Sequence, residues 1–346
     1  MKLKTTFREA LALAVRHEME KDPNVFVFGL DVPDHKKIYG STVGILEEFG
    51  PERCFGTPLS EDAMTGVALG AALSGLKPVH VHIRTDFMLL SVNQIANMIS
   101  CARYNSGGKL NVPLVIRAIF GRGWGQGAQH SKSMHGVFAH IPGLKVLMPT
   151  TAQDAYSLLR EAITDPNPVI FLEHRWFYDI EGEVDTEVDV PIGKAAIRRE
   201  GTDVTLVCTS WMTVEALKAA EILSRQGFSA EIIDVRSVAP FDSETVIRSV
   251  QKTKNCIVLD FDWVFGGFSA EISATLSERC FGVLERPVQR FGFAHAPCPT
   301  TRPLENLFYT SAPGIIRTIE KTFNLKESDL SQDEFFSYEK RFKGPF

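Results

Sequence analysis

Two adjacent carboxylates, Glu61 and Asp62, stand at the start of an apolar run of small residues, in GTPLSEDAMTGVALGAALSG. Acids in the first turn of a helix offset its dipole, and Ser60 is a suitable N-cap, so both acids could simply stabilise a helix start. The run that follows has no polar face, which predicts a buried helix. A carboxylate at the mouth of a buried helix needs a polar partner, and one of these acids is therefore a candidate for chemistry.

His130 is a second candidate, because it ends a glycine-rich loop that follows an apolar strand. Parallel sheets place ligand sites where their strands end, although a lone histidine is more often structural. The loop contains GWGQGA (123–128), which satisfies the G-x-G-x-x-A pattern of dinucleotide sites. The acid that such sites carry about 20 residues further on is missing, and no clear helix follows at once. We therefore predict an active-site loop rather than a nucleotide site.

The other histidines indicate no metal site. His135 and His140 follow His130 at spacings that match no familiar ligand pattern, and His140 in AHIPG is typical of a packed helix end. His80 and His82 face one side of a predicted strand in KPVHVHI, and the sequence alone assigns them no role.

A helix end in AITDPNP is a candidate cation site. Asp165 and Asn167 in this segment could simply close a turn. Their side chains, together with the carbonyl groups freed at the helix end, could instead bind a hard monovalent cation through oxygen ligands. Taken alone, the segment favours the turn.

Short apolar strands that alternate with helices predict a parallel sheet covered on both faces. A first series lies in residues 1–178, with strands in NVFVFG, KPVHVHI, VPLVIRAIF, GLKVLMP and PVIFLEH. Residues 179–200 are acidic and extended and are interpreted as a linker. A second series, in residues 201–325, has four predicted strands. We expect a doubly wound α/β domain, a smaller α/β domain, and a polar tail (326–346) that is mostly mobile or docks on a neighbour.

The composition of the 346 residues is that of a globular protein, with 44% hydrophobic and 23% charged residues. The net charge of −5 and the lack of a Lys/Arg block argue against nucleic acid as a partner. The N-terminal segment TTFREALALAVRHEMEKD contains a capping box and acids, and is expected to be neither signal peptide nor membrane span. Six scattered cysteines without a C-x-x-C predict reduced thiols and a cytoplasmic protein, or a mitochondrial-matrix one in a eukaryote.

Taken together, these motifs resemble the β subunit of thiamine-diphosphate-dependent 2-oxo acid dehydrogenases of the pyruvate and branched-chain types, and more broadly the pyrimidine-binding half of transketolases. The resemblance runs from about residue 7 to about residue 322. Its most specific points are GTPLSE, GVALGAALSGLKPV, YNSGG, VPLVIR, AQHS, AHIPGLKVLMPTTAQDAYSLL, NPVIFLEH, IGKA and GTDVTLV. Each is weak alone, but their order and spacing are specific. The implied fold is a pyrimidine-type thiamine-diphosphate-binding domain followed by a transketolase C-terminal-like domain.

The resemblance implies roles for single residues. Glu61 matches the glutamate that hydrogen-bonds the aminopyrimidine of the cofactor and so helps it to lose its reactive proton. Phe87 matches the aromatic residue that stacks on that ring, and His130 matches the histidine that assists acyl transfer to a lipoyl group. Five further residues fall where the family binds a structural potassium ion: Leu114, Ala162, Ile163, Asp165 and Asn167.

The resemblance also implies partners. The family holds Mg²⁺ and the diphosphate on a G-D-G…N motif, and no Gly-Asp-Gly occurs in this sequence. We therefore expect an α subunit, in an α2β2 assembly, to supply these contacts, and a lipoyl acyltransferase core to be a further partner of the complex. Leu30, in GLDV, replaces the usual family glutamate, and Glu285 stands where an acidic docking residue occurs.

Two other functions remain open at this point. The first is a split transketolase-like enzyme that transfers a two-carbon ketol unit. The second is a non-catalytic scaffold or regulatory subunit that kept the fold, although the presence of Glu61, Phe87 and His130 together argues against it.

Overall fold

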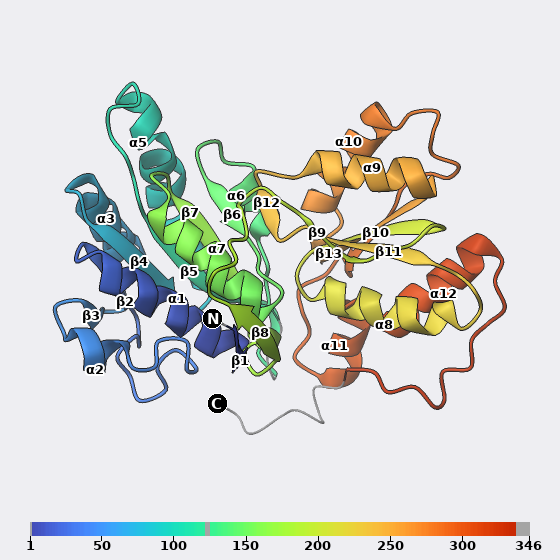
Figure 1. The fold of residues 1–346 in the computed structure, drawn as a ribbon, viewed down its shortest axis with the longest axis horizontal. Helices are drawn as coiled ribbons and strands as arrows, with labels where there is room; N and C mark the ends of the chain where they lie inside the picture. Colours follow the sequence, from blue (N-terminus) through green and yellow to red (C-terminus); the bar gives the residue numbers. More distant parts are fainter. Residues whose placement is uncertain (1, 122–124, 337–346) are drawn as a thin grey trace. The chain divides into compact units, whose positions relative to one another are not determined.

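The computed structural model describes residues 2–121 and 125–336 (Figure 1). They form two compact units. Of the described residues, the first unit contains 2–121, Ser133–Lys194 and Ser237–Phe241, and the second contains 125–132, Ala195–Arg236 and 242–336. Of the predicted GWGQGA loop, Gly123 and Trp124 lie outside the described residues. No described helix is long and apolar enough to cross a membrane.

The first unit is built on a seven-stranded sheet of order β12-β6-β7-β5-β4-β2-β3. Its pairs are parallel except for the antiparallel edge pair β12–β6. The central strands β5 and β7 are buried along their whole length, and β4 is buried after its first residue, as the continuous apolar runs predict. The strands are β2 (Val25–Gly29), β3 (Cys54–Gly56), β4 (Lys77–His82), β5 (Val115–Phe120), β6 (Lys145–Leu147), β7 (Val169–His174) and β12 (Ser237–Ala239), beside a separate pair of β1 (Lys2–Thr6) and β8 (Glu181–Asp185).

Helices cover this sheet, and α1 and α7 lie side by side (Figure 1). The predicted capping box is present, because Thr6 and Glu9 bond each other's backbone N–H groups at the start of α1. The helical stretch over residues 85–105 is not one regular α-helix, since it contains a 3₁₀ turn (η1) and a π-helical turn (η2). The helical segments are α1 (Phe7–Lys21), α2 (Ile45–Phe49), α3 (Glu61–Leu73), α4 (Thr85–Met88), η1 (Leu89–Ser91), η2 (Gln94–Ile99), α5 (Ser100–Asn105), α6 (His135–Ala139), α7 (Ala152–Thr164) and η4 (Arg175–Phe177).

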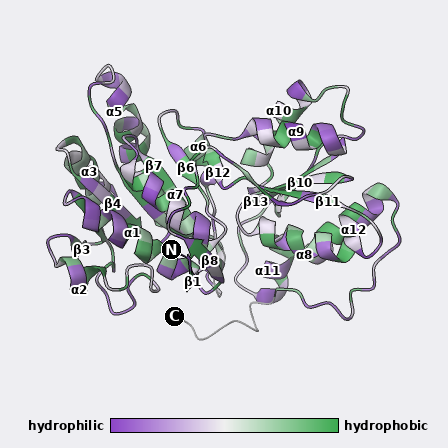
Figure 2. Cartoon of the chain, viewed as in Figure 1, coloured by the Kyte–Doolittle hydropathy of each residue, from purple (hydrophilic) through white to green (hydrophobic). Residues whose placement is uncertain are grey.

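The second unit has a five-stranded sheet of order β14-β13-β10-β11-β9, in which only the edge pair β11–β9 is antiparallel. Its helices mix hydrophobic and hydrophilic residues, as α9 and α12 show in Figure 2, because one side of each is buried. The elements are η3 (Gly127–Gln129), β9 (Ala196–Arg199), β10 (Val204–Cys208), α8 (Met212–Ser224), β11 (Ala230–Asp234), α9 (Ser243–Thr253), β13 (Cys256–Trp263), α10 (Phe268–Arg279), β14 (Gln289–Phe293), α11 (Arg302–Phe308) and α12 (Ala312–Phe323).

The segment interpreted as a linker, residues 179–200, provides two strands. Its first part forms β8, which pairs with β1, and its last part forms β9, which adds a fifth strand to the four predicted in the second sheet. The extended character was visible in the sequence, but the pairing partners lie far away along the chain.

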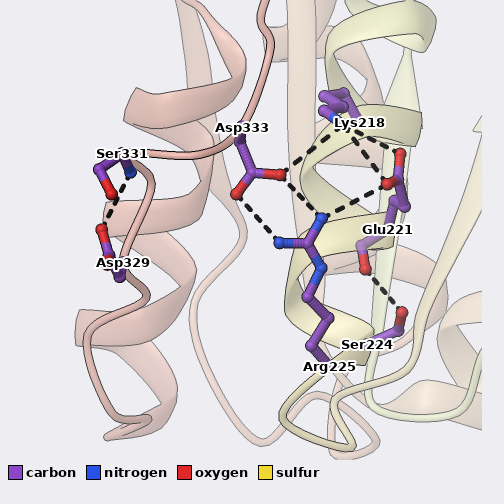
Figure 3. Close-up of polar contacts among 7 residues, drawn as sticks. All are labelled: Lys218, Glu221, Ser224, Arg225, Asp329, Ser331 and Asp333. Carbon is purple, nitrogen blue, oxygen red and sulfur yellow. Dashed lines mark hydrogen bonds and ion pairs between the residues drawn. The ribbon is translucent and has the colours of Figure 1, made fainter.

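The beginning of the polar tail docks on its own unit (Figure 3). The carboxylate of Asp333 accepts two hydrogen bonds from the guanidinium of Arg225, the residue that caps the end of α8, at 3.0 and 2.7 Å. Further along, the Phe336 ring lies 4.6 Å from that of Trp211. Residues 325–336 therefore follow the surface of α8 and α12 without forming a helix; residues 337–346 lie outside the described part of the chain.

Candidate functional site

Glu61 is the first residue of α3, as the sequence predicts, but the local details differ. Ser60 occupies the N-cap position, and its side chain makes no capping hydrogen bond. The prediction of a buried helix does not hold for the single chain, because Val67 is 53% exposed and Leu73 is exposed too. The buried residues of α3 are Thr65, Ala68, Leu69 and Ala72, which form one stripe at helical spacing.

Glu61 and Phe87 line the same cavity, which has a volume of about 190 Å³. The cavity lies between the start of α3 and the C-terminal end of β4, where parallel sheets carry their ligand sites. Phe87 is 38% exposed, and Glu61 is partly exposed. The lining also includes Leu30, Thr57, Pro58, Leu59, Ser60, Met64, His80, Val81, His82, Ile83 and Arg84. A carboxylate at the rim of a mostly apolar cavity, with an aromatic ring beside it, suits a flat heteroaromatic ligand.

The cavity wall contributed by β4 carries two histidines whose role the sequence alone does not assign. His80 and His82 are buried, and burial lowers the pKa of His80 to about 4, with the Phe28 backbone offsetting part of the shift. Burial also lowers the pKa of His82 well below its usual value. Both rings are therefore neutral at pH 7. Side chains alternate between the two faces of a strand, so both histidines lie on one face of β4, the strand that follows the helix starting at Glu61. This was the sequence signal that could have placed them in the site.

His130 belongs to the other unit. It directly follows the 3₁₀ turn η3 and is half-buried. Gly127 in that turn has a φ of +61°, and a Cβ added there would lie 2.6 Å from Thr300 Oγ1, so only glycine fits without a shift. The segment before His130 is thus fixed against the second unit, whereas Glu61 and Phe87 belong to the first.

The five candidate cation ligands surround the end of α7. Leu114, Ala162 and Ile163 are buried. The backbone C=O of Ala162 lacks the N–H that would bond it in a continuing helix, because residue 166 is proline. The C=O of Ile163 lacks its usual partner because the N–H of Asn167 donates instead to Asp165 Oδ1, at 2.9 Å.

The same corner also holds a protein cation. The ammonium group of Lys145 forms an ion pair with Asp165 Oδ2. Among the described residues, no group of three or more His, Cys, Asp or Glu side chains could hold a metal ion, so any cation here depends mainly on backbone oxygens.

Comparison with known proteins identifies the family. The transketolase pyrimidine-binding domain matches residues 4–179, and the transketolase C-terminal domain matches residues 193–315. The chain is 42% identical over 321 residues to the mitochondrial pyruvate dehydrogenase E1 component subunit β-1 of Arabidopsis thaliana, covering 91% of this chain and 88% of the relative. It is 38% identical over 310 residues to the 2-oxoisovalerate dehydrogenase subunit β of Bacillus subtilis, covering 89% and 95%. The chain belongs to the E1 β-subunit family.

The fold of this E1 β-family chain agrees with a solved structure. A split-gene transketolase, described as an inactive β4 tetramer, superimposes with a TM-score of 0.76 and covers 93% of this chain and 99% of that chain. At 23% identity the likeness shows the fold alone. The predicted resemblance and the predicted two-part, transketolase-like α/β fold are both confirmed.

Proposed function

We propose that this chain is the β subunit of a heteromeric thiamine-diphosphate enzyme that oxidatively decarboxylates a 2-oxo acid and transfers the acyl group to a lipoyl carrier. The observation that carries the proposal is the cavity shared by Glu61 and Phe87 in a member of the E1 β-subunit family. When bound, thiamine diphosphate supplies the carbon nucleophile that attacks the 2-oxo acid.

The residues of this chain would bind and orient the aminopyrimidine end of that cofactor. Glu61 hydrogen-bonds a ring nitrogen and shares a proton with it, and Phe87 packs on the ring face. The apolar lining excludes water from the ring, which strengthens the Glu61 hydrogen bond. His130, from the second unit, would assist acyl transfer.

The proposed partner is an α subunit in an α2β2 assembly, which would bring Mg²⁺ and the contacts to the diphosphate. The sequence lacks Gly-Asp-Gly, and the exposed apolar side of α3, including Val67 and Leu73, is available for subunit contact. A lipoyl acyltransferase core is a further proposed partner. Glu285, the candidate docking acid, lies 3.5 Å from the Lys254 ammonium and remains 52% exposed.

A structural potassium ion is proposed at the end of α7, bound by the carbonyl groups of Leu114, Ala162 and Ile163 with Asp165 and Asn167. The ion would have to share Asp165 with Lys145. All six cysteines are free, which supports a reducing compartment: the cytoplasm, or the mitochondrial matrix in a eukaryote.

The test is co-expression with an α partner, followed by a screen of 2-oxo acids with an artificial electron acceptor. Glu61→Gln should lower turnover by roughly 10²–10⁴-fold and leave assembly intact, because the proton-sharing group is lost but its shape is kept. Asp62→Asn is the matched control, since Asp62 is the exposed neighbouring acid outside the cavity lining, and its turnover should be unchanged.

Near-normal turnover of Glu61→Gln would overturn the role of this residue. Ketol transfer between sugars, without turnover of any 2-oxo acid, would identify a split transketolase instead. An assembled complex that is inactive with every substrate would point to a scaffold.

A further inference from the structure

The β4 wall of the Glu61 cavity carries two buried histidines that the proposed chemistry does not use. His80 is 2% exposed and His82 is 4% exposed, and both line the cavity. They lie two residues apart on one strand, so their side chains share a face of the sheet. Phe28 of β2 pairs with His80 in register, and the two rings stack at 4.5 Å.

The hydrogen bonding of the two rings differs. His82 Nε2 lies 3.3 Å from Thr65 Oγ1, one turn after Glu61 on α3. The His82 ring stands edge-on to His80 at 4.3 Å. Neither ring nitrogen of His80 makes a well-formed hydrogen bond among the described residues, although the Phe28 backbone lies near enough to offset part of the fall in the pKa of the ring. A buried polar group without a partner is costly, and a ligand that bonds it recovers that cost on binding.

The chemistry of the His80 ring limits the kinds of ligand that it can bind. A neutral imidazole offers one N–H donor and one nitrogen acceptor. One imidazole nitrogen at a time can bond the edge of an uncharged heteroaromatic ring: its N–H can donate to a ring nitrogen, or its unprotonated nitrogen can accept from an amino group. The His80 ring stacks on Phe28 and makes an edge contact with His82.

We propose that His80 hydrogen-bonds directly to the polar edge of the heteroaromatic ligand in the Glu61 cavity, and that His82, held by Thr65, is a positioning residue for the His80 ring. The inference rests on the proposed function, under which that ligand is the aminopyrimidine of thiamine diphosphate. It adds a second polar contact, on the strand side of the cavity, to the one from Glu61 on the helix side.

The first test is calorimetric binding of thiamine diphosphate to the complex reconstituted with its α partner. His80→Phe keeps a ring to stack on Phe28 but removes both nitrogens, and it should weaken binding roughly 5–30-fold, the effect of one lost buried hydrogen bond. His80→Gln keeps a donor and an acceptor and should stay closer to wild type. His17→Phe is the matched control, because His17 lies on α1 outside the cavity lining, and it should bind as wild type does.

Two cofactor analogues separate a direct contact from a structural role. One has the pyrimidine amino group replaced by hydrogen, and the other has ring nitrogen 3 replaced by CH. If His80 contacts one of these groups, the binding ratio of wild type to His80→Phe should fall close to one for the analogue that lacks it. If His80→Phe does not assemble, His80→Leu, which also removes both nitrogens, is compared with wild type on the same two analogues, and the same loss of preference is expected.

Equal binding of the cofactor by His80→Phe and wild type would overturn the inference and leave the proposed function intact. So would an equal loss of affinity for the cofactor and for both analogues, because that pattern indicates a structural role. A wild-type complex that binds no thiamine diphosphate would overturn the proposed function itself, and the inference with it.

Discussion

The sheet of the first unit buries polar side chains on both faces, and the hydrogen bonding of these side chains differs between the two faces. On one face, Arg117 of β5 donates from Nε and Nη2 to the carboxylate of Glu173 on β7, at 2.5 and 3.1 Å. Glu173 Oε2 also accepts a hydrogen bond from the Tyr178 hydroxyl group, at 2.6 Å. On the other face, His80 of β4 has no hydrogen-bond partner among the described residues.

The strand register assigns the two groups to opposite faces. Arg117 pairs with Val81, and His80 pairs with Ile116, so Arg117 and His80 differ by one step of the alternation. The α3 helix reaches the His80 face through the contact of Thr65 with His82. A paired buried charge stabilises a particular packing of the fold, whereas an unpaired neutral group beside a cavity indicates a place for a ligand.

The largest effect on stability is expected from the Arg117–Glu173 ion pair. Glu173→Gln leaves the Arg117 guanidinium buried without its counter-charge, and should lower the free energy of unfolding by about 3–5 kcal/mol. Urea denaturation measures the change. Glu183→Gln, an exposed glutamate on β8, is the control and should change little. If Glu173→Gln proves as stable as the control, the ion pair does not determine the packing of this face. Replacement of both partners by apolar residues should recover much of the loss.

A second effect, of roughly 3 kcal/mol on the free energy of unfolding, is expected from protonation of His80. Burial lowers the pKa of His80 from 6.5 to about 4 in the folded chain. Between these values the unfolded chain binds more protons, so stability should fall as the pH is lowered through this window and level off below it. His80→Phe removes this contribution, and its unfolding midpoint should depend less on pH. An unchanged pH dependence would show that His80 is already protonated, or exposed, in solution.

The smallest effect is expected at the Arg225–Asp333 pair, in which one of the two charged side chains is exposed. Asp333→Asn weakens the contact of the tail with Arg225, whose side chain is 54% exposed, and solvent screens such pairs. We expect only a small fall in Tm, but faster proteolytic cleavage of the tail. Asp329→Asn is the control, since Asp329 hydrogen-bonds Ser331 within the tail (Figure 3). Equal cleavage rates in both variants would mean that the Arg225 contact does not hold the tail.

Much of the fold could be predicted, because the spacing of hydrophobic residues that marks a strand or helix is contained within a short stretch of sequence. The buried strands β4, β5 and β7 agree closely with the predicted strands in KPVHVHI, VPLVIRAIF and PVIFLEH. The strands β9 and β12 were missed, since strands of three or four residues carry too little pattern and their pairing is decided by distant partners. The docked tail was missed for a related reason: its contacts are a few polar pairs, with Arg225 and with α12, and one aromatic contact with Trp211, which leave no periodic signal.

The candidate site was predicted unevenly. The shared cavity of Glu61 and Phe87 followed only from the resemblance, because 25 intervening residues separate them in sequence. The exposed side of α3 was misjudged, since a run of small apolar residues predicts a close contact without saying whether the sheet or another subunit provides it. The partnerless state of His80 is a property of packing, and no single-sequence pattern reports it.

The short strand β12 also limits how the gene can be divided. β12 pairs with β6, Ser237 opposite Leu147 and Ala239 opposite Val146, although about 90 residues of chain separate them. A polypeptide that stopped at Lys194 would contain every other strand of the first sheet but would leave the N–H and C=O groups along β6 without their neighbour. An open edge of this kind is a template for intermolecular pairing, so such a fragment should self-associate when it is expressed alone.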